Sequence, residues 1–148
     1  MRCTLKQDTT RSLSRRLESI RCEREAEEFI SRHASHATLS GYLNELIASH
    51  EVTIPEIIER SGISRNYIYN ILSGERAKPG RDKVVALCIG IGASFTELNR
   101  ALELVKHAPL YPKDERDARI AIAVNRGMHR VTEVNLMLEK SGLAPLDV

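Results

Sequence analysis

A run of polar side chains between Ser64 and Ser73 has the chemistry needed to read the edges of nucleic-acid bases. The apolar residues within this run are spaced as one side of a helix, which leaves a separate polar face. An arginine on such a face can pair with guanine in the major groove of DNA, and an asparagine can pair with adenine. The polar face consists of Ser64, Arg65, Asn66, Tyr69, Asn70 and Ser73.

Positive charge is concentrated around the same run. The whole chain has 22 Lys and Arg and 20 Asp and Glu, and its net charge of +2 is too small to indicate nucleic acid by itself. Six cations and two anions lie between residues 60 and 83, so this stretch carries +4 and the rest of the chain about −2. The cations are Arg60, Arg65, Arg76, Lys78, Arg81 and Lys83, and the anions are Glu75 and Asp82.

Two predicted helices joined by a short turn would position the polar face. Thr53 and Glu56 have the spacing of a capping box, and Pro55 falls in the first turn, where its missing N–H costs nothing. Gly62 suits the left-handed conformation that ends a helix, and Ser64 can cap the next one. This arrangement is typical of a helix-turn-helix, which places its second helix in the major groove.

Four pieces of sequence follow one another in the order and at the spacing of a known family. They are Ser61-Gly62-Ile63-Ser64-Arg65, then Tyr67-Ile68 with Ile71, then Ser73-Gly74-Glu75-Arg76-Ala77-Lys78-Pro79, and finally Gly92-Ala93-Ser94-Phe95-Thr96-Glu97-Leu98. With these pieces, residues from about Leu39 to His107 resemble the lambda-repressor-like DNA-binding family of phage repressors and Cro-type regulators. The resemblance implies a five-helix domain at residues 38–110 that binds double-stranded DNA and regulates transcription. Because most relatives bind as dimers on two-fold sites, it also implies a homodimer.

The resemblance assigns roles to the polar and basic residues. Four of them would face base edges, with phosphate as the alternative for Arg65 and Tyr69, and three would hold phosphate after the recognition helix. Backbone N–H groups near Thr53 would meet a phosphate at the start of the preceding helix. The base-reading residues are Arg65, Asn66, Tyr69 and Asn70, and the phosphate-holding residues are Ser73, Arg76 and Lys78.

Two residues depart from the family pattern in the first helix of the motif. Ile54 stands where the family usually has a glutamine that helps to hold DNA, and Ile58 stands where it usually has alanine. Ile54 weakens the case for a DNA contact at that point. A second hypothesis therefore stays open, in which the chain is a protein-interaction adaptor with a helix-turn-helix fold that does not bind DNA.

The segments around this domain are predicted to be helical as well, so the fold class is all-α. Residues 1–37 would form an N-terminal arm and a helical segment, the latter either one irregular helix or two short ones. Residues 111–148 would form an added helical hairpin that packs on the same core. No apolar run is long enough to cross a membrane, and the chain is expected to be cytoplasmic.

The added hairpin repeats the one before it. Arg81 to Leu87 resembles Arg116 to Ile122 at an offset of 35, and Thr96 to Asn99 resembles Thr132 to Asn135 at an offset of 36. We expect the two copies to stack as neighbouring units do in helical arrays. The second copy either thickens the core or offers an outer face to a second subunit or a protein partner. That face would comprise Met128, Met137, Leu143 and Leu146.

Other chemistry has little support in the sequence. No nucleophilic side chain lies at a spacing that would pair it with a general base. We therefore expect no catalytic residues, and we do not expect the chain to be an enzyme. His33 and His36 lack Cys or carboxylate partners at metal spacing, so neither a metal site nor a cofactor is expected. The three cysteines also lack such spacing, and Cys88 lies in an apolar run that indicates a buried, reduced thiol.

Overall fold

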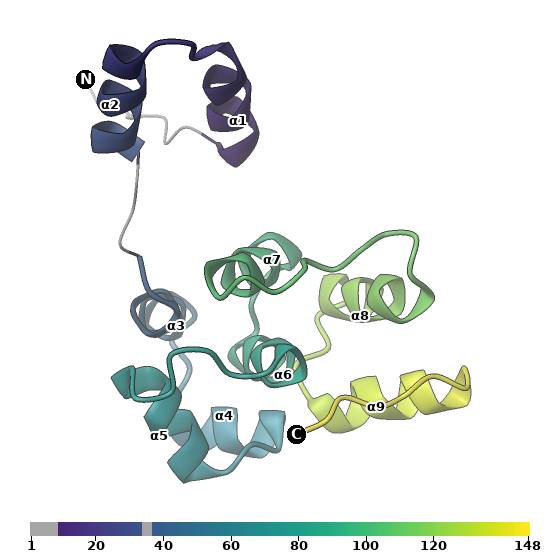
Figure 1. Cartoon of the computed structure of the whole chain (residues 1–148). Coiled ribbons are helices and arrows are strands. Elements are labelled where there is room, and N and C mark those ends of the chain that lie inside the picture. Colours follow the sequence, from purple (N-terminus) through teal and green to yellow (C-terminus); the bar gives the residue numbers. More distant parts are fainter. Residues whose placement is uncertain (1–8, 34–36) are drawn as a thin grey trace, which may run out of the picture. The chain divides into compact units, whose positions relative to one another are not determined.

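The structure, a computed structural model, describes residues 9–33 and 37–148. Within these ranges it contains nine helices and no strand, which confirms the all-α fold class (Figure 1). No helix in them is long and apolar enough to span a membrane. The predicted N-terminal arm lies almost wholly outside the described residues, as does His36.

The chain divides into two compact units, residues 1–36 and residues 37–148. The first unit contains α1 (Thr10–Ser19) and α2 (Glu23–His33), so the N-terminal segment forms two short helices rather than one irregular helix. Thr9 caps α1 by accepting a hydrogen bond from the backbone N–H of Ser12 at 3.1 Å. Neither helix contains a buried residue.

The second unit contains seven helices around one hydrophobic core, to which each of them contributes. The core is aliphatic, as expected for a chain without tryptophan and with only 4% aromatic residues. The helices are α3 (Leu39–Ser49), α4 (Ile54–Ser61), α5 (Arg65–Ser73), α6 (Arg81–Ile91), α7 (Phe95–Leu104), α8 (Glu115–Asn125) and α9 (Val131–Lys140).

Helix α6 lies at the centre of this unit, packed against α4, α7 and α9 (Figure 1). Residues 84–91 are buried on every side of the helix. Burial raises the pKa of the Cys88 thiol to about 12, so this thiol stays protonated at neutral pH. At Gly90 the helices approach so closely that an added Cβ would lie 3.2 Å from Cβ of Ser61 and 3.3 Å from the carbonyl oxygen of Ile57. The glycine at position 90 therefore allows α4 and α6 to pack this closely.

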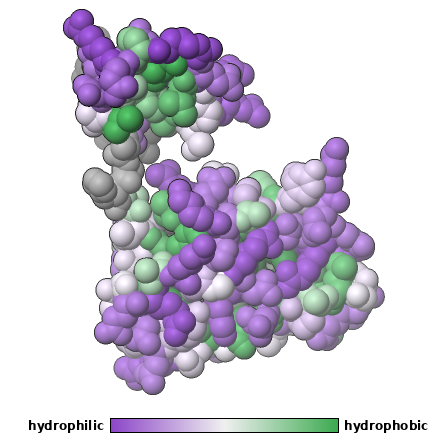
Figure 2. Space-filling view, viewed as in Figure 1, coloured by the Kyte–Doolittle hydropathy of each residue, from purple (hydrophilic) through white to green (hydrophobic). Residues whose placement is uncertain are grey.

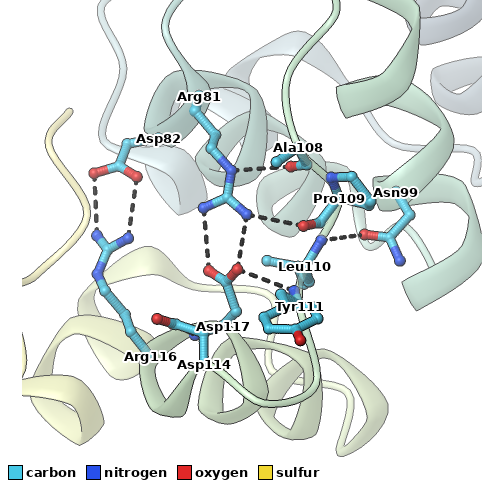
Figure 3. A network of polar contacts seen from close by, with 10 residues as sticks. All are labelled: Arg81, Asp82, Asn99, Ala108, Pro109, Leu110, Tyr111, Asp114, Arg116 and Asp117. Carbon is cyan, nitrogen blue, oxygen red and sulfur yellow. Dashed lines mark hydrogen bonds and ion pairs between the residues drawn. The ribbon is translucent and has the colours of Figure 1, made fainter.

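Two reciprocal ion pairs join the repeated hairpins α6–α7 and α8–α9 (Figure 3). The Arg81 guanidinium donates to both carboxylate oxygens of Asp117, at 3.1 and 2.9 Å. Its counterpart Arg116 donates to both carboxylate oxygens of Asp82, at 3.3 and 3.1 Å. Each arginine and each aspartate is 35 residues from its equivalent. The arginine of each copy thus binds the aspartate of the other, and we call each pair a lock.

The remaining contacts of the locks also recur in both copies. Arg81 donates to the carbonyl oxygens of Ala108 and Pro109, and Arg116 donates to those of Ala144 and Pro145. Each arginine therefore ties the start of its own hairpin to the segment that leaves it. Two equivalent asparagine carbonyls each accept one backbone N–H at 2.8 Å: Asn99 from Leu110, and Asn135 from Leu146.

This reciprocity differs from the array-like stacking that the sequence led us to expect. In an array, one surface of a repeat meets a different surface of the next, so equivalent residues do not exchange contacts. Here the same residues of both copies meet, which is the contact pattern of a two-fold relation within one chain. The second hairpin is bound to the first as one subunit of a symmetric dimer is bound to the other.

The apolar residues that one of the two alternatives placed on an outer face of the C-terminal hairpin lie in the core or against it. Leu146 is buried, and Met128, Met137 and Leu143 are half-buried against the core. The two large apolar side chains that helices α8 and α9 expose are Ile122 and Leu136. The packing therefore favours the alternative in which the second copy thickens the core, because these four residues lie in the core or against it.

Candidate nucleic-acid interface

Helices α4 and α5 are joined by a tight turn whose residues satisfy the backbone. Thr53 and Glu56 form the predicted capping box at the start of α4, with hydrogen bonds of 3.1 and 3.3 Å. Gly62 ends α4 in the left-handed region at φ +72°. Ser64 then caps α5 by accepting the backbone N–H of Tyr67 at 3.3 Å. These caps begin and end the two helices within one residue of where the sequence placed them.

Helix α5 divides into an inner and an outer face. Ile68 and Ile71 are fully buried in the core. Arg65, Asn66 and Tyr69 are exposed, and Tyr69 leaves 44% of its surface to solvent. Asn70 is half-buried and Ser73 is exposed on the same outer side. The structure therefore brings the predicted base-reading residues together on one accessible face.

A tyrosine holds two of the nearby cations. Tyr67 is half-buried, and its ring lies under the Arg76 guanidinium at 4.6 Å and the Lys83 ammonium at 5.0 Å. Contacts of this kind attract a cation to the ring face and orient it. Lys83 was not among the predicted site residues, because its role depends on the ring of a residue from another helix. The sequence indicated Lys83 only as one more cation, in the first turn of the helix that follows the basic loop.

The loop after α5 forms a polar hollow beside these cations. The hollow has a volume of about 440 Å³ and is lined by Asn70, Glu75, Arg76, Ala77 and Lys78. The backbone N–H of Arg76 donates to the carbonyl oxygen of Asn70 at 3.0 Å, which ties the loop to the helix. Arg76 and Lys78 are exposed, so both can reach an anion in solvent.

A second hollow, more apolar, lies between α4 and α5. It has a volume of about 320 Å³ and is lined by Ile54, Pro55, Ile58, Glu59, Arg65 and Tyr69. The two isoleucines that depart from the family pattern are half-buried here, side by side with the exposed Tyr69 ring. The Arg65 guanidinium lies over that ring at 5.4 Å. The departures therefore create an apolar surface next to the polar face.

Two predicted phosphate-binding positions already make hydrogen bonds within the chain. At the start of α4 the capping box uses the N–H groups of Thr53 and Glu56, and Pro55 has none, so the box leaves only the N–H of Ile54 in this turn for a phosphate. The Ser73 hydroxyl donates to the carbonyl oxygen of Asn70 at 3.2 Å and accepts the N–H of Glu75 at 3.4 Å. Arg76 and Lys78 are the better candidates for phosphate.

Two of the charged residues counted around α5 do not belong to its exposed face. Arg81 and Asp82 belong to the locks between the hairpins, so neither contributes to this face. Five cations and one anion of the counted stretch are left, and the balance stays at +4. Glu59, at the rim of the apolar hollow, pairs with Arg130 of the segment before α9 at 2.8 Å. This hydrogen bond lowers the pKa of the Glu59 carboxyl below its usual range.

The arrangement can bind a polyanion and read hydrogen-bonding groups, because donors on α5 lie beside cations on the following loop and on α6. Among residues 9–33 and 37–148, no group of three or more His, Cys, Asp or Glu could hold a metal ion. Comparisons with protein-family models, curated proteins and solved structures found no match to the chain.

Proposed function

We propose that the chain is a sequence-specific DNA-binding transcriptional regulator, in which α5 is the recognition helix of a helix-turn-helix. The observation that carries the proposal is the combination of one exposed face with Arg65, Asn66 and Tyr69 and an adjoining group of cations oriented on Tyr67. In this proposal, α3 to α7 are the five-helix lambda-repressor-like core. Helices α8 and α9 are the addition.

The proposed contacts divide by chemistry. Arg65 and Asn66, in the first turn of α5, would reach base edges, where arginine favours guanine and asparagine favours adenine. Arg76, Lys78 and Lys83 would hold phosphates and fix the register of the helix without reading sequence. The protein would act by occluding a promoter or by recruiting other proteins to it, with no covalent chemistry.

Duplex binding measured against salt tests the proposal. A pool of random duplex DNA is incubated with the full chain at low ionic strength, and the retained fragments are sequenced. Affinity for the enriched duplex is then measured by fluorescence anisotropy over a series of salt concentrations. We expect a steep linear fall of log affinity with log salt, at about 0.9 per phosphate contacted. Failure to retain any duplex at low salt overturns the proposal.

Single substitutions separate the two kinds of contact. Lys78→Ala should weaken binding to all sequences and reduce the salt slope by about 0.9. Arg65→Ala should relax the preference at one base position, by about 1–3 kcal/mol of discrimination. Lys140→Ala is the matched control, because Lys140 is an exposed lysine at the end of α9, away from the face. An equal effect of Lys140→Ala and Lys78→Ala would contradict the assigned interface.

The apolar hollow between α4 and α5 favours a second candidate, a protein-interaction adaptor. Ile54, Ile58 and Tyr69 offer an aliphatic and aromatic surface that suits an apolar side chain of a partner protein better than a phosphate. The salt series distinguishes the two functions, since binding through such a surface depends weakly on salt. Retention of a protein by the full chain, lost in Tyr69→Ala and insensitive to Lys78→Ala, would favour the adaptor.

A further inference from the structure

The N-terminal unit has an apolar stripe that is only partly buried. Leu13 and Leu17 lie one turn apart on α1, Ile20 follows the end of that helix, and Phe29 and Ile30 lie on α2. Leu13, Ile20 and Phe29 are half-buried. Leu17 leaves 56% of its surface exposed and Ile30 leaves 58%. Figure 2 shows apolar side chains gathered on one face of this unit. The pattern is that of helices whose apolar side meets further helices.

The two helices carry opposite charge. Helix α1 has three arginines and one glutamate, a net +2, and α2 has four glutamates and two arginines, a net −2 with neutral histidine. A contact joins them, since Nη2 of Arg16 and Nε2 of His33 lie 2.7 Å apart. The hairpin therefore has one basic and one acidic helix beside a partly exposed apolar stripe.

A pair of helices of this size does not reach stability alone. Isolated helices shorter than about 12–15 residues are marginal in water, and α1 and α2 have 10 and 11 residues. Units of fewer than about 40 residues without disulfides or metals usually need oligomerisation to bury enough apolar surface. An additional pair of helices would supply that surface.

We propose that the N-terminal hairpin binds the same hairpin of a second copy of this chain, forming a four-helix bundle. In an antiparallel two-fold bundle, each α1 lies between its own α2 and the partner's α2. The basic helix of each copy is then flanked by two acidic helices, and both apolar stripes face inward. The charge segregation thus selects an identical hairpin as the occupant. This proposal goes beyond DNA binding and does not depend on it.

Sedimentation equilibrium of the full chain tests the proposal. At about 100 µM, where association of moderate affinity saturates, we expect twice the monomer mass of 16.6 kDa. Leu17→Asp with Ile30→Asp should weaken the dimer by about 100-fold or more, because it removes two buried aliphatic side chains. Ile122→Asp with Leu136→Asp is the matched control, with similar exposure on α8 and α9, and should leave the mass doubled. A wild-type monomer, or a dimer lost only in the control, overturns the proposal.

A charge-exchange experiment covers the case in which the aspartate variant merely unfolds the hairpin. Arg11→Glu with Arg15→Glu makes α1 −2, while Glu23→Lys with Glu27→Lys makes α2 +2. Each variant alone then has two helices of like charge, but a mixture pairs a negative hairpin with a positive one. At low ionic strength we expect weak self-association of each variant and a heterodimer in the mixture. A mixture that associates no better than either variant alone overturns the proposal, as does a monomer whose stripe packs on residues 37–148.

Discussion

The two hairpins of the repeat have the same polar contacts but differ in what surrounds them. Leu87 in α6 and Ile122 in α8 are equivalent positions, yet Leu87 is fully buried and Ile122 is 51% exposed. The next pair, Cys88 and Ala123, is buried in both copies. The repeat therefore reproduces the contacts between the hairpins, whereas the burial of the remaining positions depends on each copy's other neighbours.

The neighbour that makes the difference is α4. Helix α6 packs against α4 as well as α7 and α9, so no side of it is left to solvent. Helix α8 packs chiefly against α7 and α9 and keeps one side exposed. Hence α6 connects the proposed DNA-binding face to the repeat, and α8 closes the outer end of the unit.

Truncating the side chains at positions 87 and 122 should change the free energy of unfolding most, and by the most unequal amounts. Leu87→Ala should lower the free energy of unfolding by about 3 kcal/mol, because it leaves a cavity in a fully packed core. Ile122→Ala should cost less than about 1 kcal/mol, since half of that side chain is already in water. Urea unfolding followed by circular dichroism gives both values. Equal losses would mean that the two hairpins are embedded alike.

The two locks should also contribute unequally to stability, with a smaller difference than that between Leu87 and Ile122. Each aspartate also accepts one backbone N–H at 3.0 Å, Asp117 from Tyr111 and Asp82 from Asp147, but the Asp117 side chain is 10% exposed and that of Asp82 is 25% exposed. Asp117→Ala should therefore lower the free energy of unfolding by about 2 kcal/mol and Asp82→Ala by about 1 kcal/mol. The difference arises because the groups that lose their partner at Asp117 are less accessible to water. A cycle with Arg81→Ala should show coupling to Asp117→Ala. Additive losses would contradict the lock.

Much of this fold could be predicted from local signals in the sequence. The capping box at Thr53 placed the start of α4, the cap at Ser64 placed the start of α5, and Gly62 placed the end of α4. These signals succeed because a cap involves residues only three positions apart. The repeat was also visible, because its two copies match residue by residue.

What could not be predicted is how distant segments meet. Arg81 and Asp82 were counted as charges of the proposed DNA-binding face, but their partners Asp117 and Arg116 are 36 and 34 residues away in the other copy. Lys83 was omitted from the site because its position depends on the Tyr67 ring. One of two alternatives placed Met137 on an outer face, but it is half-buried against a core built from segments far apart in the sequence.

Exchanging the residues at another equivalent pair should give an effect of about 1–3 kcal/mol. Gly90→Asn puts a side chain where even a Cβ would lie 3.2 Å from Ser61, so α4 must move away. Its equivalent Asn125 ends α8 and is exposed, so Asn125→Gly should cost only about 0.5 kcal/mol. Thermal unfolding measures both, and Gly90→Asn should also weaken DNA binding if α4 supports α5. Wild-type stability of Gly90→Asn would rule out the close α4–α6 contact.

Acid should weaken the Asp117 lock. Burial by itself raises the pKa of this carboxyl, but the hydrogen bonds from Arg81 and Tyr111 and the charges of Arg81 and Arg116 outweigh it, so the pKa lies below its usual range. A carboxyl whose pKa is lower in the folded state stabilises the fold above its unfolded pKa of about 3.9, and this contribution is lost as the pH falls toward the folded pKa. The stability difference between wild type and Asp117→Asn should therefore shrink below about pH 4 in urea titrations. A difference that stays constant from pH 7 to 3 would contradict this assignment.

The smallest expected effect tests whether the two locks act on each other. Arg116 binds Asp82, yet its charge also helps to lower the pKa of Asp117. Arg116→Gln removes that charge while leaving the Arg81–Asp117 pair intact, so the pKa of Asp117 should rise toward its usual value. Carbon-13 NMR titration of the side-chain carboxyl measures this directly, with Arg119→Gln as control, because Arg119 pairs with Glu115 on the same helix. An unchanged Asp117 pKa in Arg116→Gln would mean that the locks are independent contacts. A rise confined to Arg116→Gln would mean that the two-fold arrangement joins them into one electrostatic unit.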